Sequence, residues 1–216
     1  MTHESVPNPK SEIRNPKSVP LGRIVKSNSH TDYVAQVYRK WEVPSAPTPA
    51  NHAFGTFVRI PVTPAHELVG IVYDTQLLNP EFGAIGPRLA SRTEVEVFAP
   101  DYLDEKAVLV GIFIAGERAK RDNGTWLFSQ DVPALAADVD AEVYSLAEDE
   151  VRAFHATTDG PRVGYFPRLL AQRTPVSPGL MLSILDRLTG LFPDESTRLS
   201  VLRRNIAWQA SVGAAR

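Results

Sequence analysis

The feature that most constrains this chain is a series of short apolar segments between Pro20 and Gly116, separated from one another by turn residues. β-Branched and aromatic residues dominate the segments, and Gly, Pro, Asn or Asp stand at the breaks. This pattern favours β-strands, because such side chains pack well on a pleated surface. The intervals show no convincing amphipathic helix, which parallel strands would need as a crossover. The stretch therefore predicts an antiparallel sandwich or a closed barrel.

Individual strands are placed by alternation and by turn signals. The polar run 27–32 supplies turn chemistry, and residues 42–51 contain three prolines that make a loop or an edge. We expect a strand that opens at Ile24 and Val25, followed by strands over 33–38, 54–60, 67–73, 93–98, 108–114 and 125–128.

Beyond residue 131 the hydrophobic period changes to that of helices. Ser145 and Glu148 have the spacing of a capping box, which predicts a helix that ends near His155. A short helix over 166–172 follows, and then two amphipathic helices that suggest a hairpin packed on the barrel or on another subunit. Their apolar faces consist of Leu180, Met181, Ile184, Leu185 and Leu188, and then of Leu199, Leu202 and Ile206.

The chain is thus predicted to be an α+β protein with three parts. Residues 1–19 hold three prolines among polar neighbours and are expected to form a disordered arm. Residues 20–131 form a small closed barrel in which antiparallel pairing predominates, and residues 132–216 form a helical C-terminal region.

The formal net charge of −2 hides two opposed blocks. Residues 131–159 carry eight acidic side chains against one arginine, whereas residues 160–216 carry eight arginines, no lysine and three acidic side chains. The two blocks could compensate each other locally, with little net energy per exposed pair. Alternatively, the arginines form a basic surface for a phosphate backbone or an acidic partner.

Composition excludes several classes of site. The chain has no cysteine, so it holds neither disulfides nor thiolate metal sites. Its five histidines are scattered singly, and we expect no metal and no cofactor. Ser29, His30 and Asp32 include the residue types of a hydrolytic triad, but a tight turn favours a structural role. No apolar run reaches the length of a membrane span, and the N-terminus lacks a signal core, so we expect a cytoplasmic protein without membrane contact.

A family resemblance rests on the order of several short pieces. The block Leu21–Val25, the polar turn, Gly55–Val58, Leu68–Val72 and Leu78–Pro80 together resemble the HAS barrel. This is the small N-terminal β-barrel of HerA-type DNA-translocating ATPases and rotary ATP synthase subunits, and the similarity covers roughly residues 20–118. The resemblance implies a barrel of about six strands that helps to assemble a ring and offers a docking surface to partners such as a nuclease.

The ATPase core that follows this barrel in HerA-type enzymes has no counterpart here. Its phosphate loop needs the pattern G-x-x-x-x-G-K-[ST], which is absent from the sequence. We therefore expect a protein that is not an enzyme.

Two functions are favoured, and an enzyme whose site is assembled from the loops is a third option. The first is assembly: Leu185 and Leu188 would form an exposed apolar anchor on a HerA-type ATPase, a nuclease or a second copy of the chain. The second is nucleic-acid binding through Arg198, Arg203 and Arg204. The long loop after Tyr73 could also carry binding, with Asn79 and Arg88 as candidates. Several aromatic residues either interleave with arginines as an oligonucleotide face or fill the core: Tyr33, Tyr38, Phe57 and Tyr73, with Arg23, Arg39 and Arg59.

Overall fold

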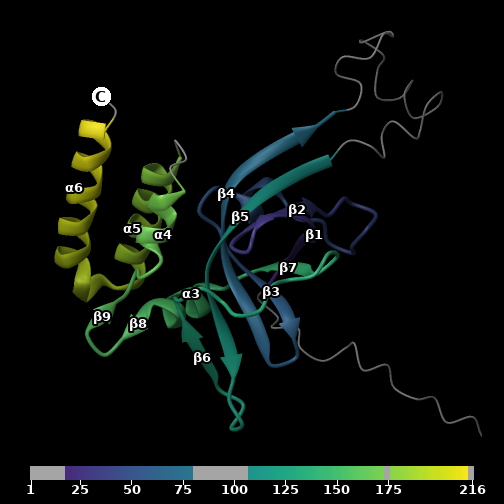
Figure 1. The fold of residues 1–216 in the computed structure, drawn as a ribbon, viewed down its shortest axis with the longest axis horizontal. Coiled ribbons are helices and arrows are strands. Elements are labelled where there is room, and N and C mark those ends of the chain that lie inside the picture. Colours follow the sequence, from purple (N-terminus) through teal and green to yellow (C-terminus); the bar gives the residue numbers. More distant parts are fainter. Residues whose placement is uncertain (1–17, 80–106, 173–175, 214–216) are drawn as a thin grey trace, which may run out of the picture.

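The computed structural model describes residues 18–79, 107–172 and 176–213. Seven strands form the main sheet (Figure 1), and two further short strands pair with each other. The strands are β1 (Pro20–Ser29), β2 (Asp32–Val37), β3 (Phe57–Thr63), β4 (His66–Leu78), β5 (Ala107–Lys120), β6 (Trp126–Ser129), β7 (Glu142–Ser145), β8 (Ala156–Thr157) and β9 (Gly160–Pro161). The helices are α3 (Glu148–His155), α4 (Phe166–Ala171), α5 (Ser177–Leu191) and α6 (Ser196–Gly213), with 3-10 turns η1 (Pro49–His52) and η2 (Pro193–Glu195).

Six of the strands close into a barrel. Around the ring the neighbours are β1, β2, β5, β4, β3 and β7, and β7 returns to β1. All of these pairings are antiparallel, and β6 adds to the far end of β5 outside the ring. The prediction of a closed six-stranded antiparallel barrel followed by helices is therefore confirmed.

The strand β7 is the one part of the ring that the sequence pattern did not predict. Val143 points into the barrel and is fully buried. The hydroxyl of Ser145 accepts a hydrogen bond from the Val19 amide at 2.9 Å, and the Ser145 amide donates to the Val19 carbonyl at 2.9 Å. The barrel thus includes a strand from the region assigned to helices, and Val19, assigned to the arm, is held against it. Residues 1–17 lie outside the described residues.

The predicted capping box was wrong, because Ser145 belongs to β7. The helix α3 begins at Glu148, and the Glu150 carboxylate accepts the Ala147 amide at 3.0 Å. Its end at His155 was predicted correctly. The strands expected around Ile24 and over 33–38, 54–60, 67–73, 108–114 and 125–128 are observed within a few residues, and the strand expected over 93–98 lies outside the described residues.

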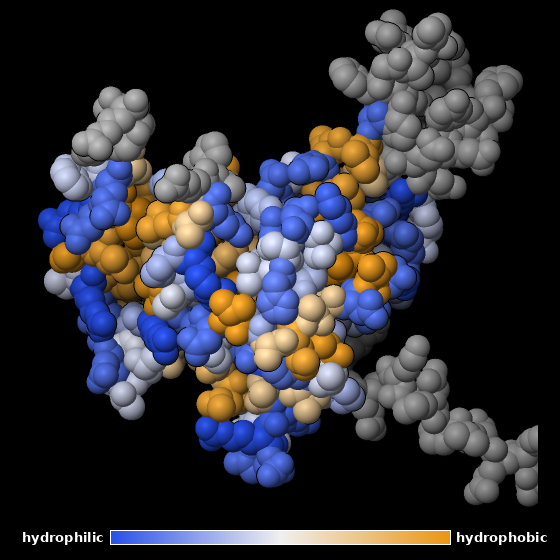
Figure 2. Space-filling model, in the orientation of Figure 1, coloured by the Kyte–Doolittle hydropathy of each residue, from blue (hydrophilic) through white to orange (hydrophobic). Residues whose placement is uncertain are grey.

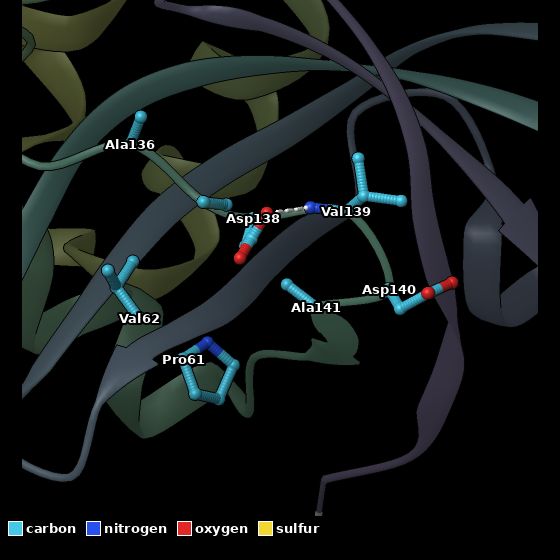
Figure 3. Close-up of a pocket in the computed structure, with 8 residues that line it drawn as sticks. Pro61, Val62, Ala136, Asp138, Val139, Asp140 and Ala141 are labelled. Atoms are coloured by element: carbon cyan, nitrogen blue, oxygen red, sulfur yellow. Dashed lines mark hydrogen bonds between the residues drawn. The ribbon is translucent and has the colours of Figure 1, made fainter.

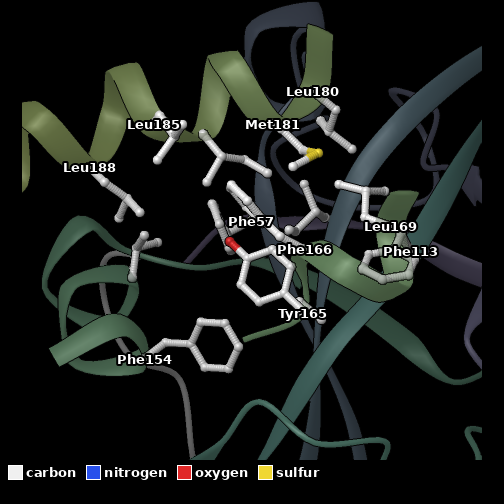
Figure 4. Packing of buried hydrophobic residues seen from close by; sticks show 14 of the residues in the cluster. Phe57, Phe113, Phe154, Tyr165, Phe166, Leu169, Leu180, Met181, Leu185 and Leu188 are labelled. Atoms are coloured by element: carbon white, nitrogen blue, oxygen red, sulfur yellow. The ribbon is translucent and has the colours of Figure 1, made fainter. Parts of the chain in front are cut away.

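Buried side chains form two clusters. One fills the barrel, with large members such as Tyr33, Ile60 and Ile112 at most 2% exposed. The other, which we call the seam, lies between the barrel and the helices (Figure 4). Phe57 and Phe113 come to the seam from the barrel, and helical residues cover them from the other side.

A network of buried charges joins the barrel to α3. The Glu67 carboxylate accepts hydrogen bonds from Arg59 at 3.0 Å and from Arg118 Nε at 2.7 Å. Arg118 also donates to Glu150 of α3 at 2.8 Å. The Arg59, Glu67 and Arg118 side chains are each at most 5% exposed. Buried charges of this kind are tolerated only when they are paired, so the network fixes how α3 meets the barrel.

Candidate docking surface

The predicted apolar anchor is part of the seam. Leu185 and Leu188 are both 0% exposed, and Figure 4 shows their side chains directed from α5 toward Phe57, Phe154 and Tyr165. The expectation that they form an exposed anchor is therefore wrong. The physical reason is that α5 packs its apolar face on the barrel of its own chain, which removes that face from water.

Several residues of the predicted oligonucleotide face are internal, although Arg23 is exposed. Tyr33 is 2% exposed inside the barrel, and Phe57 is 0% exposed in the seam. The hydroxyl of Tyr73 donates to Asp32 at 2.8 Å. Arg59 is committed to Glu67 and stacks 4.4 Å from the Tyr144 ring centre. The alternative interpretation, in which these aromatics fill the core, holds for Tyr33 and Phe57.

The acidic and basic blocks of the C-terminal half contact each other. Arg187 of α5 donates to Glu148 of α3 at 2.5 Å, and Arg162 lies 4.0 Å from Asp131. Arg198 donates to the Asp159 carbonyl. Local compensation of the two blocks, the first of the two interpretations, is thus observed for Arg187 and Arg162, whereas Arg198 contacts a main-chain carbonyl.

Arg168 has a different task, because its guanidinium donates to main-chain carbonyls. It reaches Ala115 of β5 at 2.7 Å and Gln130 at 2.8 Å. Burial lowers the pKa of Arg168 from its ordinary value. This side chain therefore ties α4 to β5 and to the residue after β6, and these hydrogen bonds compete with binding of an anion.

The three arginines proposed for nucleic-acid binding do not share one surface. Successive residues of an α-helix are rotated by about 100°, so Arg198, Arg203 and Arg204 point in different directions around α6. Arg203 forms an ion pair with Asp186 of α5 at 2.6 Å, and the hydrogen bond to that carboxylate raises the pKa of Arg203. Arg204 is exposed. These positions spread the charge around the helix rather than aligning it along a groove.

The outer face of α6 carries apolar side chains that its own chain does not cover. Trp208 is 67% exposed and Val201 is 45% exposed, whereas Leu199 and Ile206 are 3% and 6% exposed on the opposite side, toward α5. Val201, Arg204 and Trp208 fall at spacings of three and four, which places them on one side of the helix. We call these three residues the α6 outer face. Figure 2 shows that apolar side chains reach the surface over the helices as well as over the barrel.

A shallow pocket of about 610 Å³ lies on the barrel (Figure 3). Pro61 and Val62 at the end of β3 form one wall, and residues 136–141 form the other. The pocket is both apolar and acidic, because Val139 is 63% exposed and both Asp138 and Asp140 line it. Asp140 has a φ of 65°, a left-handed conformation that aspartate adopts more readily than most residues. We call it the acidic pocket.

Neither the α6 outer face nor the acidic pocket was predicted from the sequence. Trp208 and Val201 are spaced by seven residues, a helical signal that was available in the sequence. The acidic pocket had no such signal, because its walls are far apart in the chain. Asn79 is exposed just after β4, next to the exposed Leu77 and Leu78, and Arg88 lies outside the described residues. The prediction for that loop therefore stays a prediction.

Within the described ranges, no three His, Asp or Glu side chains are grouped so as to hold a metal ion. The buried His155 has its Nδ1 at 2.8 Å from the Val151 carbonyl and its Nε2 at 2.9 Å from the Tyr165 hydroxyl. Burial lowers the pKa of His155 to about 4, so this ring is neutral at physiological pH. In this arrangement His155 serves as a hydrogen-bonded core residue.

None of the helices that the structure describes is both long and apolar enough to cross a membrane.

These observations define an α+β protein in which a closed antiparallel barrel is covered on one side by helices, with surface faces available for contact. A family model described as a domain of unknown function (DUF8166) matches residues 5–216, nearly the whole chain, and the chain belongs to this family. No curated protein matches it.

Proposed function

We propose that this chain is a non-catalytic docking protein, built on a HAS-type barrel, that acts with a HerA-type ATPase or a nuclease in DNA processing. The observation that carries the proposal is the α6 outer face, where Trp208 is 67% exposed on the side of the helix that faces away from the chain's own core. An uncovered tryptophan on a rigid helix is the kind of residue that dominates the binding energy of protein interfaces.

The composition of the α6 outer face supports a protein partner. Trp and Arg are both enriched at protein interfaces, and Arg204 lies between Val201 and Trp208 on the helix. The helix itself is firmly placed, because Leu199 and Ile206 bury its other side and Arg203 is paired with Asp186 of α5. A preordered face loses little entropy on binding.

The filled interior of the barrel also favours a function in which partners bind at the protein surface. Within the described residues, barrel side chains such as Tyr33, Ile60 and Ile112 are at most 2% exposed, so the space inside the ring is occupied by protein. The resemblance to the HAS barrel supports the same role, since that barrel serves for assembly and docking. A six-stranded antiparallel ring is compatible with it.

Nucleic-acid binding through the C-terminal arginines is less well supported. Arg203 is paired with Asp186, and Arg198 is bound to the Asp159 carbonyl. Phosphate binding would compete with these contacts. The same experiment can separate the two functions, because binding to a phosphate backbone weakens steeply with salt.

The test measures binding of the purified chain to purified HerA-type ATPase and nuclease by titration calorimetry. Trp208→Ala is expected to weaken binding about 30-fold or more, the effect of losing a hot-spot side chain. Trp41→Ala is the matched control, because Trp41 is 64% exposed on the barrel, and it should leave the affinity unchanged.

Two results would overturn the docking function. One is the absence of binding to every such partner, and the other is an equal loss of affinity for Trp41→Ala and Trp208→Ala. Salt-sensitive binding to a single-stranded oligonucleotide, weakened by Arg204→Glu, would support the nucleic-acid function instead.

A further inference from the structure

We propose that the α6 outer face of one copy binds the acidic pocket of a second copy, so that the chain assembles head to tail with itself. This inference rests on the proposed function of the α6 outer face as a docking surface, and it names an occupant. The two surfaces are complementary in charge and in apolar character, and they lie on different parts of the molecule.

The positive charge of α6 determines which charge the surface that binds it must carry. The helix Ser196–Gly213 contains three arginines and neither Asp nor Glu. If two copies of α6 paired face to face, Arg204 of each would approach the other's arginines, and like charges that lose water at an interface repel each other strongly. The complementary surface therefore has to be acidic, with an apolar part for Trp208 and Val201.

The acidic pocket meets both requirements. Its carboxylates, on Asp138 and Asp140, belong to exposed residues, and one oxygen of Asp138 accepts the Val139 amide at 2.8 Å (Figure 3). Its apolar lining includes Pro61, Val62 and the exposed Val139. An aromatic side chain can cover that lining while a neighbouring guanidinium reaches a carboxylate in bidentate geometry. This is the combination that Trp208 and Arg204 offer, one helical turn apart.

The two surfaces cannot meet within one chain. In Figure 1, α6 lies on the outside of the helical layer, and α5 separates it from the barrel, where β3 contributes Pro61 and Val62 to the pocket. Each copy thus presents one donor face and one acceptor pocket. Contacts between two different surfaces are heterologous, and they build a closed ring or an open filament according to the rotation between copies.

The test combines sedimentation velocity with variants that each damage one surface. The wild type is expected to grow in mass with concentration from monomer to species larger than a dimer. Trp208→Ala with Arg204→Glu should remain monomeric, and so should Asp138→Lys with Asp140→Asn. Asparagine is chosen at position 140 because it accepts a positive φ. The controls are Arg121→Glu and Asp122→Lys, which make the same Arg→Glu and Asp→Lys replacements in an exposed hairpin turn and should assemble like the wild type.

Mixing the two damaged proteins gives the decisive result. Each retains one working surface, so an equimolar mixture should form a dimer and nothing larger. In an isologous α6 dimer, by contrast, the pocket variant would still dimerise alone. Circular dichroism of each variant verifies that it is folded. If the double variant of the α6 outer face is not folded, the single variant Arg204→Glu replaces it, and Asp138→Lys likewise replaces the double variant of the acidic pocket.

The inference is overturned by any one of three results with folded protein. These are a wild type that is monomeric at every concentration up to the millimolar range, self-association of the pocket variant, or a mixture that stays monomeric. Such a failure is distinct from failure of the proposed function. A monomeric protein that still loses its ATPase or nuclease partner on Trp208→Ala would keep the docking function and lose only this self-association.

Discussion

The inner face of α5 and the outer face of α6 are built from similar apolar side chains, yet they meet different surroundings. Leu185 and Leu188 are 0% exposed against barrel residues of the same chain, whereas Val201 and Trp208 are 45% and 67% exposed. Each pattern alone would serve as an anchor for a partner. The difference teaches that an amphipathic pattern identifies an apolar face, and that only the rest of the fold decides whether that face is already covered.

The largest expected difference in the free energy of unfolding is between a variant of a buried charge and a variant of an exposed charge. Glu67→Gln leaves Arg59 and Arg118 buried without their shared carboxylate, and such a loss costs about 3–5 kcal/mol. Asp122→Asn, in an exposed turn, should change the free energy of unfolding by less than about 0.5 kcal/mol. Urea denaturation of both variants measures the difference. Equal stabilities would mean that the Glu67 network does not hold the barrel and α3 together.

The two helix faces can be compared directly by truncating one residue of each. Leu185→Ala removes a fully buried side chain from the seam and should lower the free energy of unfolding by about 2–5 kcal/mol. Val201→Ala should lower it by no more than about 0.5 kcal/mol, because the side chain is half exposed. Chemical denaturation at a concentration where the protein is monomeric separates stability from assembly. A larger loss of unfolding free energy for Val201→Ala than for Leu185→Ala would mean that Val201, and not Leu185, belongs to the buried face.

Acidic pH should weaken the seam through His155. Its pKa is lowered to about 4 in the folded chain by burial first and by the charge of Arg187, against the hydrogen bond to the Val151 carbonyl, which raises it. Since the unfolded chain binds this proton near pH 6.5, stability from this group is fully present above that pH. It is lost as the pH falls toward 4, and the total is about 3 kcal/mol.

The measurement is the pH dependence of unfolding for wild type and His155→Gln. Glutamine can still hydrogen-bond but does not titrate, so the difference in stability between the two proteins should shrink between pH 7 and pH 4. If the two curves run parallel over that window, His155 is not buried as a neutral ring.

Exposed ion pairs should give the smallest effect. Arg187 and Glu148 lie 2.5 Å apart, with side chains 26% and 60% exposed. A double-mutant cycle with Arg187→Gln and Glu148→Gln should yield a coupling of about 0.2–1 kcal/mol that decreases with added salt. A coupling as large as that expected in the Glu67 network would erase the distinction between buried and exposed charges.

The barrel could be predicted from the sequence because its strands carry a local signal. Runs rich in β-branched and aromatic residues around Val34 and Ile71, with turn residues between strands, mark each strand without reference to its partner. The β7 strand has no such signal, since its four residues are placed by pairing with β1 and β3. Ser145 and Glu148 had the spacing of a helix cap, but the Ser145 hydroxyl is bound to the Val19 amide. Distant partners overrode the local pattern.

The candidate surfaces were less predictable than the fold. Leu185 was assigned to a partner because sequence spacing cannot distinguish intramolecular from intermolecular burial. Trp208 carried a helical signal but no indication that it faces outward. The acidic pocket joins Pro61 to Asp138, which approach each other only because β7 brings the preceding segment back to β3.

The position of β7 in the ring also constrains how the chain folds as it is synthesised. Val19 and Ser145 contact each other across 126 positions of sequence, and β7 is the strand between β1 and β3. Five strands of the ring can therefore leave the ribosome and pair into an open sheet while its two edges wait for residues 142–145. Closure at such a sequence distance has a large loop entropy, which slows folding and leaves strand edges exposed in the meantime. A nascent chain arrested before β7 should thus be the form of this protein most in need of a chaperone.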